Sequence, residues 1–393
     1  MEKTDVVIIG AGAAGLMCAA AASRRRRKVV VLDHSGRPGN KILVSGGGRC
    51  NFTNYHVDAG CYLSGNPHFC KSALSRFSQW DFLERVKTYE IPFHEREHGQ
   101  LFCDGSAREI LDMLLTECRI GDVSIRLKAV IHSIEKLGGR HYAVRSGRGD
   151  FHCESLVIAT GGLSVPSLGA SPFGYKIAEQ FGLKVRPIRP ALVPLTLNPA
   201  DKERFSALSG IAVDANVRFR DQSFRGNLLF THRGLSGPAV LQISSYWEPG
   251  GVVAIDLLPG MDLGETLEKW KEVRPKIYFR TALSERLPKR LVDAVSGERF
   301  SEVMLRRLDR RMMEEAAMLF HKWRIKPGGT EGYRTAEVTA GGVDCDGISS
   351  KTMEARDVEG LFFVGEVLDV TGRLGGYNLQ WAWSSGWCAG QYA

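Results

Sequence analysis

Three glycines in the segment Gly10–Gly15 have the spacing of a loop that binds the pyrophosphate of a dinucleotide. The loop follows the apolar run Val6–Ile9 and opens an alanine-rich segment, so we expect a strand, a tight turn and a helix in that order. The first glycine allows the turn, the second lets the pyrophosphate approach the backbone, and the third lets the helix pack on the strand. The N–H groups at the helix N-terminus then face the phosphates. We predict that the pyrophosphate contacts Gly10, Gly12, Ala13, Ala14 and Gly15.

An acidic residue stands where this motif requires one. Asp33 ends the next apolar run, 18 residues after Gly15, and is placed to accept a hydrogen bond from a ribose hydroxyl. A strand, a helix and an acid in this order favour a dinucleotide site over a chance glycine loop. We also include Val130 among the predicted cofactor contacts.

Two later strands also run into glycine, and they favour FAD over NAD as the dinucleotide. The first exit is Ala159–Gly162, and the second is Gly365-Glu366, which begins 355 residues after Gly10. A bound NAD does not require a closing segment so far along the chain, whereas the ribityl chain and isoalloxazine of FAD extend across the sheet to a second crevice. The predicted contacts at these exits are Ala159, Thr160, Gly161, Gly162, Gly365 and Glu366.

A third glycine-rich segment lies just after the second strand. It can place consecutive N–H donors along a phosphate or a flavin edge, with an arginine beside them as an anion partner. The alternative is a flexible surface loop, but three successive glycines cost backbone entropy that a plain loop would not need. We predict cofactor contacts at Ser45, Gly46, Gly47, Gly48, Arg49, Cys50 and Asn51.

The segment Gly372–Gln380 leads into an apolar stretch that predicts a last helix. A helix N-terminus aimed at flavin N1 and the C2 carbonyl would stabilise the negative charge that appears there on reduction. The residues expected at this helix start are Gly375, Gly376, Tyr377, Asn378 and Leu379.

The chain resembles the BaiN/YhiN-type family of FAD-dependent oxidoreductases over nearly its whole length. The motifs that carry the resemblance are Gly10–Gly15, KILVSGGGRCNFTN at Lys41–Asn54, THRGLSGPAVL at Thr231–Leu241, and Ala336–Gly386. The resemblance implies non-covalently bound FAD, with Lys41 among its contacts and Gly365–Asp369 as a C-terminal flavin motif that includes Asp369. It also implies reduction of carbon–carbon double bonds as one activity. Asn40 stands where we expect the family to carry arginine, so position 40 is assigned no phosphate contact.

Four short apolar runs predict the core of the fold. They are continuous and rich in β-branched or aromatic residues, as in parallel strands buried on both faces. They come from both ends of the chain, which predicts an α/β fold with a discontinuous, Rossmann-like FAD-binding domain of the glutathione-reductase type at 1–188 and 334–393. The resemblance implies an inserted β-barrel-like domain, expected at 189–260 and 324–333, and a helical piece at 261–323, where Met304 to Ala317 recur at helical spacing. The four runs are Val6–Ile9, Val29–Leu32, Leu156–Ala159 and Leu361–Val364.

Two further motifs resemble a zinc site and a hydrolase site, but each lacks the local structure that such a site needs. His94–His98 matches H-E-x-x-H, but Pro92 and Gly99 leave no room for the helix that would turn both imidazoles toward zinc, so no metal is expected and a polar turn is predicted. The serine of THRGLSGP lacks the strand-to-helix setting of a hydrolase nucleophile. We place His232 and Arg233 at the rim of the flavin cleft, and both substrate contact and plain loop polarity remain open for them.

These patterns predict an enzyme that passes a hydride between FAD and a small organic substrate. NAD(P)H is the expected electron donor, docking transiently because no second G-x-G-x-x-G follows a strand. The nine cysteines contain no C-x-x-C pair, which argues against a disulfide reductase and favours a cytoplasmic chain with free thiols. No apolar run is long enough for a membrane helix.

The net charge of +8 leaves a second class of function open, an RNA-binding flavoprotein that modifies or senses nucleic acid. The basic segment Lys269–Arg324 motivates this alternative, but it contains no RNA-binding motif, so we do not expect a nucleic-acid partner. A flavin-binding regulator without turnover also remains open.

Overall fold

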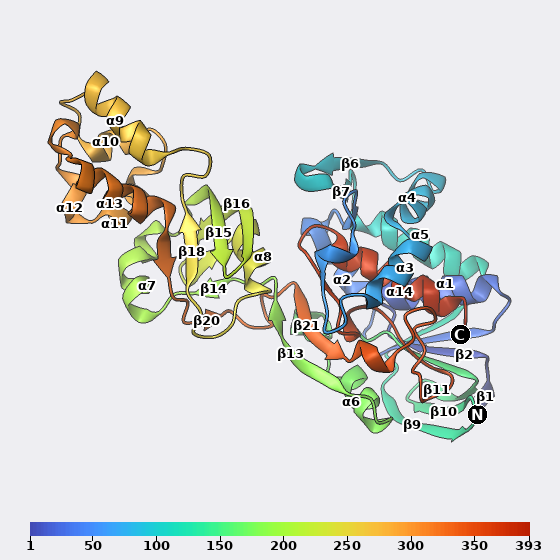
Figure 1. Cartoon of the computed structure of the whole chain (residues 1–393). Helices are drawn as coiled ribbons and strands as arrows, with labels where there is room; N and C mark the ends of the chain where they lie inside the picture. Colours follow the sequence, from blue (N-terminus) through green and yellow to red (C-terminus); the bar gives the residue numbers. More distant parts are fainter. The chain divides into compact units, whose positions relative to one another are not determined.

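The computed structural model describes the backbone of residues 1–393 and every side chain except that of Ser301. The chain forms two compact units, and each has its own hydrophobic core (Figure 1). The first unit consists of Met1–Arg189 and Val338–Ala393, and the second of Pro190–Glu337. The finer three-part division at residues 260 and 323 stays a prediction.

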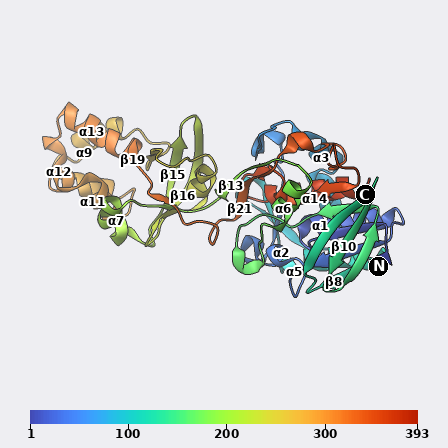
Figure 2. The same cartoon turned by 90° about the horizontal axis from the view of Figure 1, so that it is seen from below.

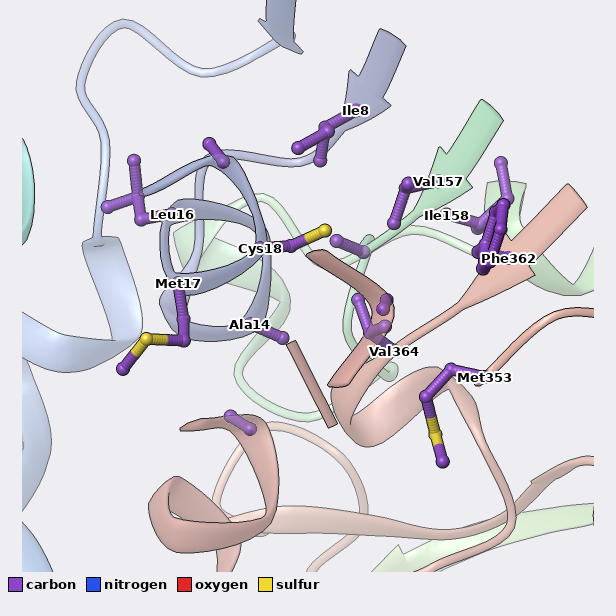
Figure 3. Close-up of a cluster of buried hydrophobic side chains, with 14 of the residues drawn as sticks. Ile8, Ala14, Leu16, Met17, Cys18, Val157, Ile158, Met353, Phe362 and Val364 are labelled. Carbon is purple, nitrogen blue, oxygen red and sulfur yellow. The ribbon is translucent and has the colours of Figure 1, made fainter. Parts of the chain in front are cut away.

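A five-stranded parallel sheet forms the centre of the first unit, and it confirms the predicted Rossmann-like α/β fold. Its strands lie in the order β22, β12, β2, β3, β8. The four apolar runs supply the first four of these strands, and every residue of β2, β12 and β22 is buried. Figure 3 shows Ile8, Val157 and Phe362 on these neighbouring strands. The bounds are Leu361–Phe363 (β22), Ser155–Ile158 (β12), Val6–Ile9 (β2), Val29–Asp33 (β3) and Ser124–Leu127 (β8).

Two largely buried helices from opposite ends of the chain pack on each other, and the first of them also packs on this sheet. They are α1 (Ala13–Arg24) and α14 (Tyr377–Gly390). A Cβ on Gly386 of α14 would overlap the carbonyl oxygen of Ala14, so glycine lets the two helix backbones approach closely. Helix α14 therefore covers α1, the helix that follows the glycine loop.

Smaller elements complete the first unit. A meander of β9, β10 and β11, with β1 beside it, lies at one side of the unit (Figure 1; β10 is also labelled in Figure 2). A three-stranded sheet in the order β4, β7, β6 and the helices α2 to α5 come after β3 in the chain. The bounds are Glu2–Lys3 (β1), Asn40–Val44 (α2), Asn51–Asn54 (β4), Tyr62–Leu63 (β5), Phe69–Arg76 (α3), Gln79–Thr88 (α4), Phe93–Arg96 (β6), Gln100–Cys103 (β7), Ala107–Ile120 (α5), Ile131–Gly138 (β9), His141–Ser146 (β10), Gly149–Cys153 (β11), Phe173–Gln180 (α6), Val185–Ala191 (β13), Val338–Val343 (β21) and Thr371–Gly372 (β23).

The second unit combines a seven-stranded sheet with a group of helices. The strands lie in the order β19, β18, β15, β16, β17, β14, β20, and β15 alternates buried and exposed residues as an antiparallel strand with one wet face does. Helices α9 to α13 gather together at one end of this unit (Figure 1). The bounds are Leu195–Thr196 (β14), Pro199–Phe205 (α7), Ala212–Phe219 (β15), Gln222–Phe230 (β16), Gly234–Ser236 (β17), Pro238–Ser244 (α8), Val253–Asp256 (β18), Leu263–Val273 (α9), Phe279–Leu283 (α10), Lys289–Ser296 (α11), Glu298–Ser301 (α12), Arg310–His321 (α13), Trp323–Ile325 (β19) and Gly329–Thr330 (β20).

One helix of the second unit starts later than the sequence pattern predicts. Met304 and Leu308, which recur at helical spacing with later residues, lie before α13 and outside any α-helix. The preceding 3-10 turn ends at Arg307, and Asp309 accepts a hydrogen bond from the backbone N–H of Met312, so it caps α13 at that point. The expectation of one continuous helical pattern from Met304 was therefore wrong.

None of the helices in residues 1–393 is both long enough and apolar enough to cross a membrane.

Candidate functional site

The three glycines of the first loop have different surroundings. A Cβ on Gly10, whose φ is +113°, would overlap the carbonyl oxygen of Ala159, and a Cβ on Gly15 would overlap that of Gly10. A Cβ on Gly12, the residue that caps α1, would meet no atom within 4 Å. Packing therefore requires the first and third glycines, whereas the second faces space that the protein leaves free. That space beside the first N–H groups of α1 fits the pyrophosphate of a dinucleotide.

The ends of three strands meet at this loop. The Gly10 N–H donates to Leu32 O at 2.8 Å, and the Ala159 N–H donates to Ile9 O at 2.8 Å. Gly365, with a φ of +75°, lies so close to α1 that a Cβ there would stand 2.8 Å from the Cβ of Ala14. Figure 3 shows Ala14 and Val364 in this region. The structure therefore brings the predicted residues at the ends of β2, β12 and β22 together.

Two other predicted residues, Thr160 and Gly161, belong to the first exit, which follows β12. The buried hydroxyl of Thr160 points toward Gly174 of α6, where a Cβ would overlap it. Gly161 has a φ of +70°, and a Cβ there would lie 3.9 Å from the carboxylate of Glu366. The exit after β12 therefore lies next to the exit after β22.

Asp33 lies at the end of β3, beside the glycine loop. One of its carboxylate oxygens accepts from the Ala11 N–H at 2.6 Å and the other from the Ser35 N–H at 2.7 Å. The Ala129 N–H donates to Asp33 O at 2.8 Å, and the next residue, Val130, is 57% exposed. Asp33 thus shapes the loop directly, and its hydrogen bond to a ribose stays a prediction.

A network of polar side chains joins two predicted segments. Lys41 Nζ lies 2.7 Å from Glu366 Oε2 and donates to Ser164 Oγ at 2.6 Å. Ser164 Oγ donates to Glu366 Oε1 at 2.9 Å, and the Thr339 N–H donates to the same oxygen at 3.0 Å. The glutamate charge is therefore balanced by one cation and held by two further donors. The network fixes Lys41 beside the strand exits after β12 and β22.

The segment Ser45–Asn51 forms a tight turn. Residues 45–48 make a 3-10 turn in which Gly46 and Gly47 have φ values of +56° and +67°, a region that favours glycine. A Cβ on Gly47 would meet no atom within 4 Å. Cys50 is fully buried, and burial raises the pKa of its thiol to about 12, so it stays protonated at neutral pH. Cys50 is therefore no thiolate nucleophile in this protein.

The start of α14 lies against β4, which follows that turn. A Cβ on Gly376, whose φ is +93°, would overlap the backbone of Thr53, and Thr53 Oγ1 donates to the Gln380 side chain at 2.6 Å. The Asn54 amide donates to Gly375 O at 2.9 Å, and the amide of Asn51 lies 3.2 Å from the Gly376 N–H. The structure therefore brings the predicted glycine-rich turn and the predicted helix start together.

The next residues of α14 use their polar groups locally. Asn378 Oδ1 accepts from the Gly372 N–H at 2.8 Å and its amide donates back to Gly372 O at 3.0 Å. Tyr377 O accepts from the Tyr62 hydroxyl at 3.0 Å, and Leu379 is half-buried. The side chain of Asn378 therefore fixes the turn before the helix. The flavin contacts through backbone N–H groups that the sequence predicts for this segment stay a prediction.

Asp369 is held by a different group of residues. Its carboxylate accepts from the Gly65 N–H at 2.8 Å and lies 3.4 Å from Arg186, which also pairs with Asp344 at 3.2 Å. Burial raises the pKa of the Asp369 carboxyl, and Gly65 and Arg186 oppose that rise. These contacts are local to the segments around 65, 186 and 344. The role of Asp369 toward FAD stays a prediction.

The remaining predicted residues belong to other elements of the fold. His232 and Arg233 belong to the second unit, where both are exposed and Arg233 lies 3.7 Å from Glu331, so their place at a cleft rim stays a prediction. His94 lies in β6 and bonds to Asp104 at 2.5 Å, so the polar turn predicted for this motif is in fact a strand followed by a 3-10 turn. The described residues contain no cluster of side chains that could hold a metal ion.

Sequence reasoning missed Ser164, Thr339, Gln380 and Ser385. Thr339 Oγ1 accepts from the Leu163 and Ser164 N–H groups, and the Ser385 hydroxyl accepts from the Gly365 N–H at 3.0 Å. Thr339, Gln380 and Ser385 fall inside the motif Ala336–Gly386, but hydroxyl and amide groups have no spacing rule that would single them out.

Comparison with known proteins finds relatives along the whole chain. Residues 4–392 match the family model described as HI0933-like protein Rossmann domain. The chain is 54% identical over 393 residues to the ribosomal RNA dihydrouridine synthase of Escherichia coli, covering 100% of this chain and 98% of that protein. It is 48% identical over 394 residues to the protein of the same name from Haemophilus influenzae, at 99% and 98% coverage. It is 31% identical over 405 residues to the 3-dehydro-bile acid delta(4,6)-reductase of Clostridium scindens, with 98% of each chain covered.

Two solved structures share the fold. The open conformation of a flavocytochrome c3 fumarate reductase has a TM-score of 0.50 at 16% identity, over 99% of this chain and 78% of that one. The 3-ketosteroid-delta4-(5alpha)-dehydrogenase of Rhodococcus jostii RHA1 has a TM-score of 0.50 at 14% identity, with 99% and 97% covered. The predicted FAD cofactor, the oxidoreductase class and the resemblance to BaiN/YhiN-type flavoproteins are confirmed. The protein is an FAD-dependent oxidoreductase.

Proposed function

Because the chain belongs to the HI0933-like Rossmann family, we propose that it reduces the C5=C6 double bond of a uridine in ribosomal RNA with a hydride from FAD. The observation that carries this proposal is the identity of 54% to a protein named for that product, over the whole chain. The expectation that nucleic acid is no partner is not confirmed, since a second relative has the same name. The reaction belongs to the class that the sequence predicts, the saturation of a carbon–carbon double bond.

The reaction balances with NAD(P)H as the donor. FAD, when bound, would supply the hydride chemistry: a hydride taken from NAD(P)H would go to one carbon of the double bond, and a proton from water would go to the other carbon. NAD(P)H and a proton are thus consumed, and dihydrouridine and NAD(P)⁺ are formed. The donor itself is part of the proposal.

The residues of the chain divide the work of holding FAD. Gly12 and the first N–H groups of α1 would hold the pyrophosphate, and Asp33 would hold the ribose. The N-terminus of α14, fixed by Asn54 and Thr53, would direct its N–H groups toward the flavin ring. These N–H groups need no proton exchange to stabilise negative charge, so their effect persists across neutral pH.

A second candidate keeps the same chemistry with another substrate. The relative with 31% identity is named as a reductase of a bile acid, which is a small molecule. An unsaturated ketone is therefore the alternative to a uridine, and His232 and Arg233 remain candidates for contact with either. The two substrates differ in size and charge, so one assay can separate them.

The test supplies the FAD-loaded protein with NADPH or NADH and with ribosomal RNA transcribed without modifications. After digestion to nucleosides, mass spectrometry should detect a uridine derivative that has gained two hydrogens. The variant Gly12→Val, which should lack FAD, serves as the control. If RNA stays unchanged while a steroid enone reoxidises the reduced flavin, the substrate is the small molecule and the RNA proposal is wrong.

A further inference from the structure

Four arginines lie within six residues of the second unit. Arg306 and Arg307 belong to a 3-10 turn (Leu305–Arg307), and Arg310 and Arg311 begin α13. All four are exposed, with 88% of the Arg310 side chain accessible. Arg310 pairs with Glu314 at 3.0 Å, and the ion pairs between described residues include none for the other three. The surface therefore carries charge that the fold does not neutralise.

A neighbouring segment adds a cation and an aromatic ring. Leu305 N–H donates to Ile277 O at 2.8 Å, and the Phe279 N–H donates to Val303 O at 2.8 Å, so residues 275–279 and 303–306 run antiparallel. Tyr278 pairs with Met304 in this short ladder. The Arg306 N–H donates to Pro275 O at 3.0 Å, so Arg306 lies beside the residue that precedes the exposed Lys276. Tyr278 is 43% exposed.

This arrangement costs stability. Four like charges within six residues repel one another. Arginine at the start of a helix opposes the helix dipole, and the first turn of α13 holds no acidic residue. Among the acids of this stretch, Glu314 pairs with Arg310 and Glu315 with Arg299. This leaves the helix cap Asp309 and the exposed Glu302 against the other three arginines. Such a surface is explained better by a polyanionic partner than by folding.

We infer that this surface docks the phosphate backbone of the RNA substrate. The inference rests on the proposed function, and it assigns to the second unit a binding task separate from the FAD chemistry of the first. Arginine pairs with phosphate through a planar fork of donors, and an exposed tyrosine beside such cations can stack on an unpaired base. The arginine surface, as we call it, consists of Lys276, Tyr278, Arg306, Arg307, Arg310 and Arg311.

The test compares the FAD-loaded wild type with the double variant Arg306→Ala/Arg307→Ala. Binding of a fluorescein-labelled RNA hairpin with an unpaired uridine-containing loop is titrated at several salt concentrations. The affinity of the variant should fall by about tenfold, and the slope of log K against log salt should become shallower by about 1.4, the value for two lost phosphate contacts on single-stranded RNA. Flavin reduction by NAD(P)H should stay unchanged.

The matched control is Arg218→Ala/Arg220→Ala, which removes two exposed arginines from the β15 region of the same unit. The control should bind the hairpin like the wild type. Equal losses in both double variants would mean that net charge alone acts, and this would overturn the inference. As a single variant, Tyr278→Ala should also weaken RNA binding at high salt. Tyr278→Phe, which keeps the aromatic ring, should not.

The outcomes separate this inference from the proposed function. If the wild type modifies RNA and the Arg306→Ala/Arg307→Ala protein binds it with unchanged affinity, only the docking surface is wrong. If the wild type binds no RNA even at low salt, the proposed function fails as well. Binding to vesicles rich in phosphatidylserine, lost in the same variant and without any RNA binding, would assign the surface to a membrane and overturn the inference.

Discussion

The two units differ in the chemical groups that are their candidate contacts: backbone groups in the first and side chains in the second. In the first, the four residues of β2 are all buried, and the candidate contacts are backbone groups of glycines packed between strands and helices. In the second, β15 alternates buried and exposed residues, and the candidate contacts are exposed side chains. Gly10 and Gly15 of the backbone site cannot take a side chain without disturbing the packing around them, whereas exposed side chains can be replaced without such a change. Substitutions in the two units should therefore differ in what they damage.

The largest expected effect is the loss of stability of the first unit in the variant Gly15→Ala. The added Cβ would overlap the carbonyl oxygen of Gly10 and lie 3.2 Å from the Cβ of Ala159, so the strand and the helix must separate. We expect a loss of more than about 3 kcal/mol of stability, although alanine alone would favour the helix by roughly 1 kcal/mol. Denaturant unfolding measures it.

The matched control for that variant is Gly226→Ala in β16, where the Cβ would approach no atom closer than 3.6 Å. Its stability should stay within about 1 kcal/mol of the wild type. If both variants proved equally stable, close backbone packing would not distinguish the glycine loop.

Gly12→Val should abolish FAD binding without unfolding the protein. A Cβ at this position meets no protein atom within 4 Å, so we expect the packing to stay intact, but that space is where the pyrophosphate is expected. Circular dichroism and the absorbance of bound flavin measure the two effects separately. A folded Gly12→Val protein that still purifies yellow would remove this role from Gly12.

Asp33→Ala should raise the dissociation constant for FAD by about one to two decades. Loss of a charge-assisted hydrogen bond is worth roughly 1.5–3 kcal/mol, and the Ala11 and Ser35 N–H groups would also lose their acceptor. Asp33→Asn, which keeps an acceptor oxygen, should lose less affinity. Fluorescence titration of the apoprotein compares them, and equal constants for wild type and Asp33→Ala would mean that another group holds the ribose.

The pair Lys41 and Glu366 should show a coupling of about 1 kcal/mol. Their side chains are 35% and 18% exposed, so solvent screens part of the attraction. Lys41→Met should leave the glutamate charge with one donor fewer, and adding Glu366→Gln should recover part of the loss. Thermal unfolding of the FAD-free single and double variants closes the cycle, and additive effects would show that the two residues act independently.

The smallest effect should come from the arginine surface. Because Arg306 and Arg307 are exposed and lack an acidic partner among the described residues, replacing both by alanine should change stability by no more than about 0.5 kcal/mol. Denaturant unfolding measures it. A large loss would show that these arginines support the fold, and the comparison between the two units would fail at that point.

Much of the first unit follows from local sequence. The four apolar runs predict four of the five strands, because strands buried on both faces have continuous apolar residues. β8 escapes this rule since it lies at the edge of the sheet, where all four of its residues are only half-buried. The β9–β11 meander escapes it too, because its outer strands carry many polar residues.

The site shows the same limit. The glycine motifs are visible because each is a local pattern with a backbone reason. The network of Lys41 with Glu366 joins residues 325 positions apart, and no local pattern encodes which donor meets which carboxylate. The late start of α13 depends on a single capping aspartate, which competes with an apolar pattern that suggests an earlier start.

The close packing of α1 against α14 also bears on how the protein is made. The helix that follows the glycine loop, α1, leaves the ribosome before α14, which covers it and follows more than 350 residues later. At about 5–20 residues per second, tens of seconds pass in between. The second unit is a single stretch with its own core, so it can fold during that interval. The alanine-rich face of α1 stays uncovered until α14 is synthesised. The nascent first unit is therefore the part of the chain most in need of a chaperone.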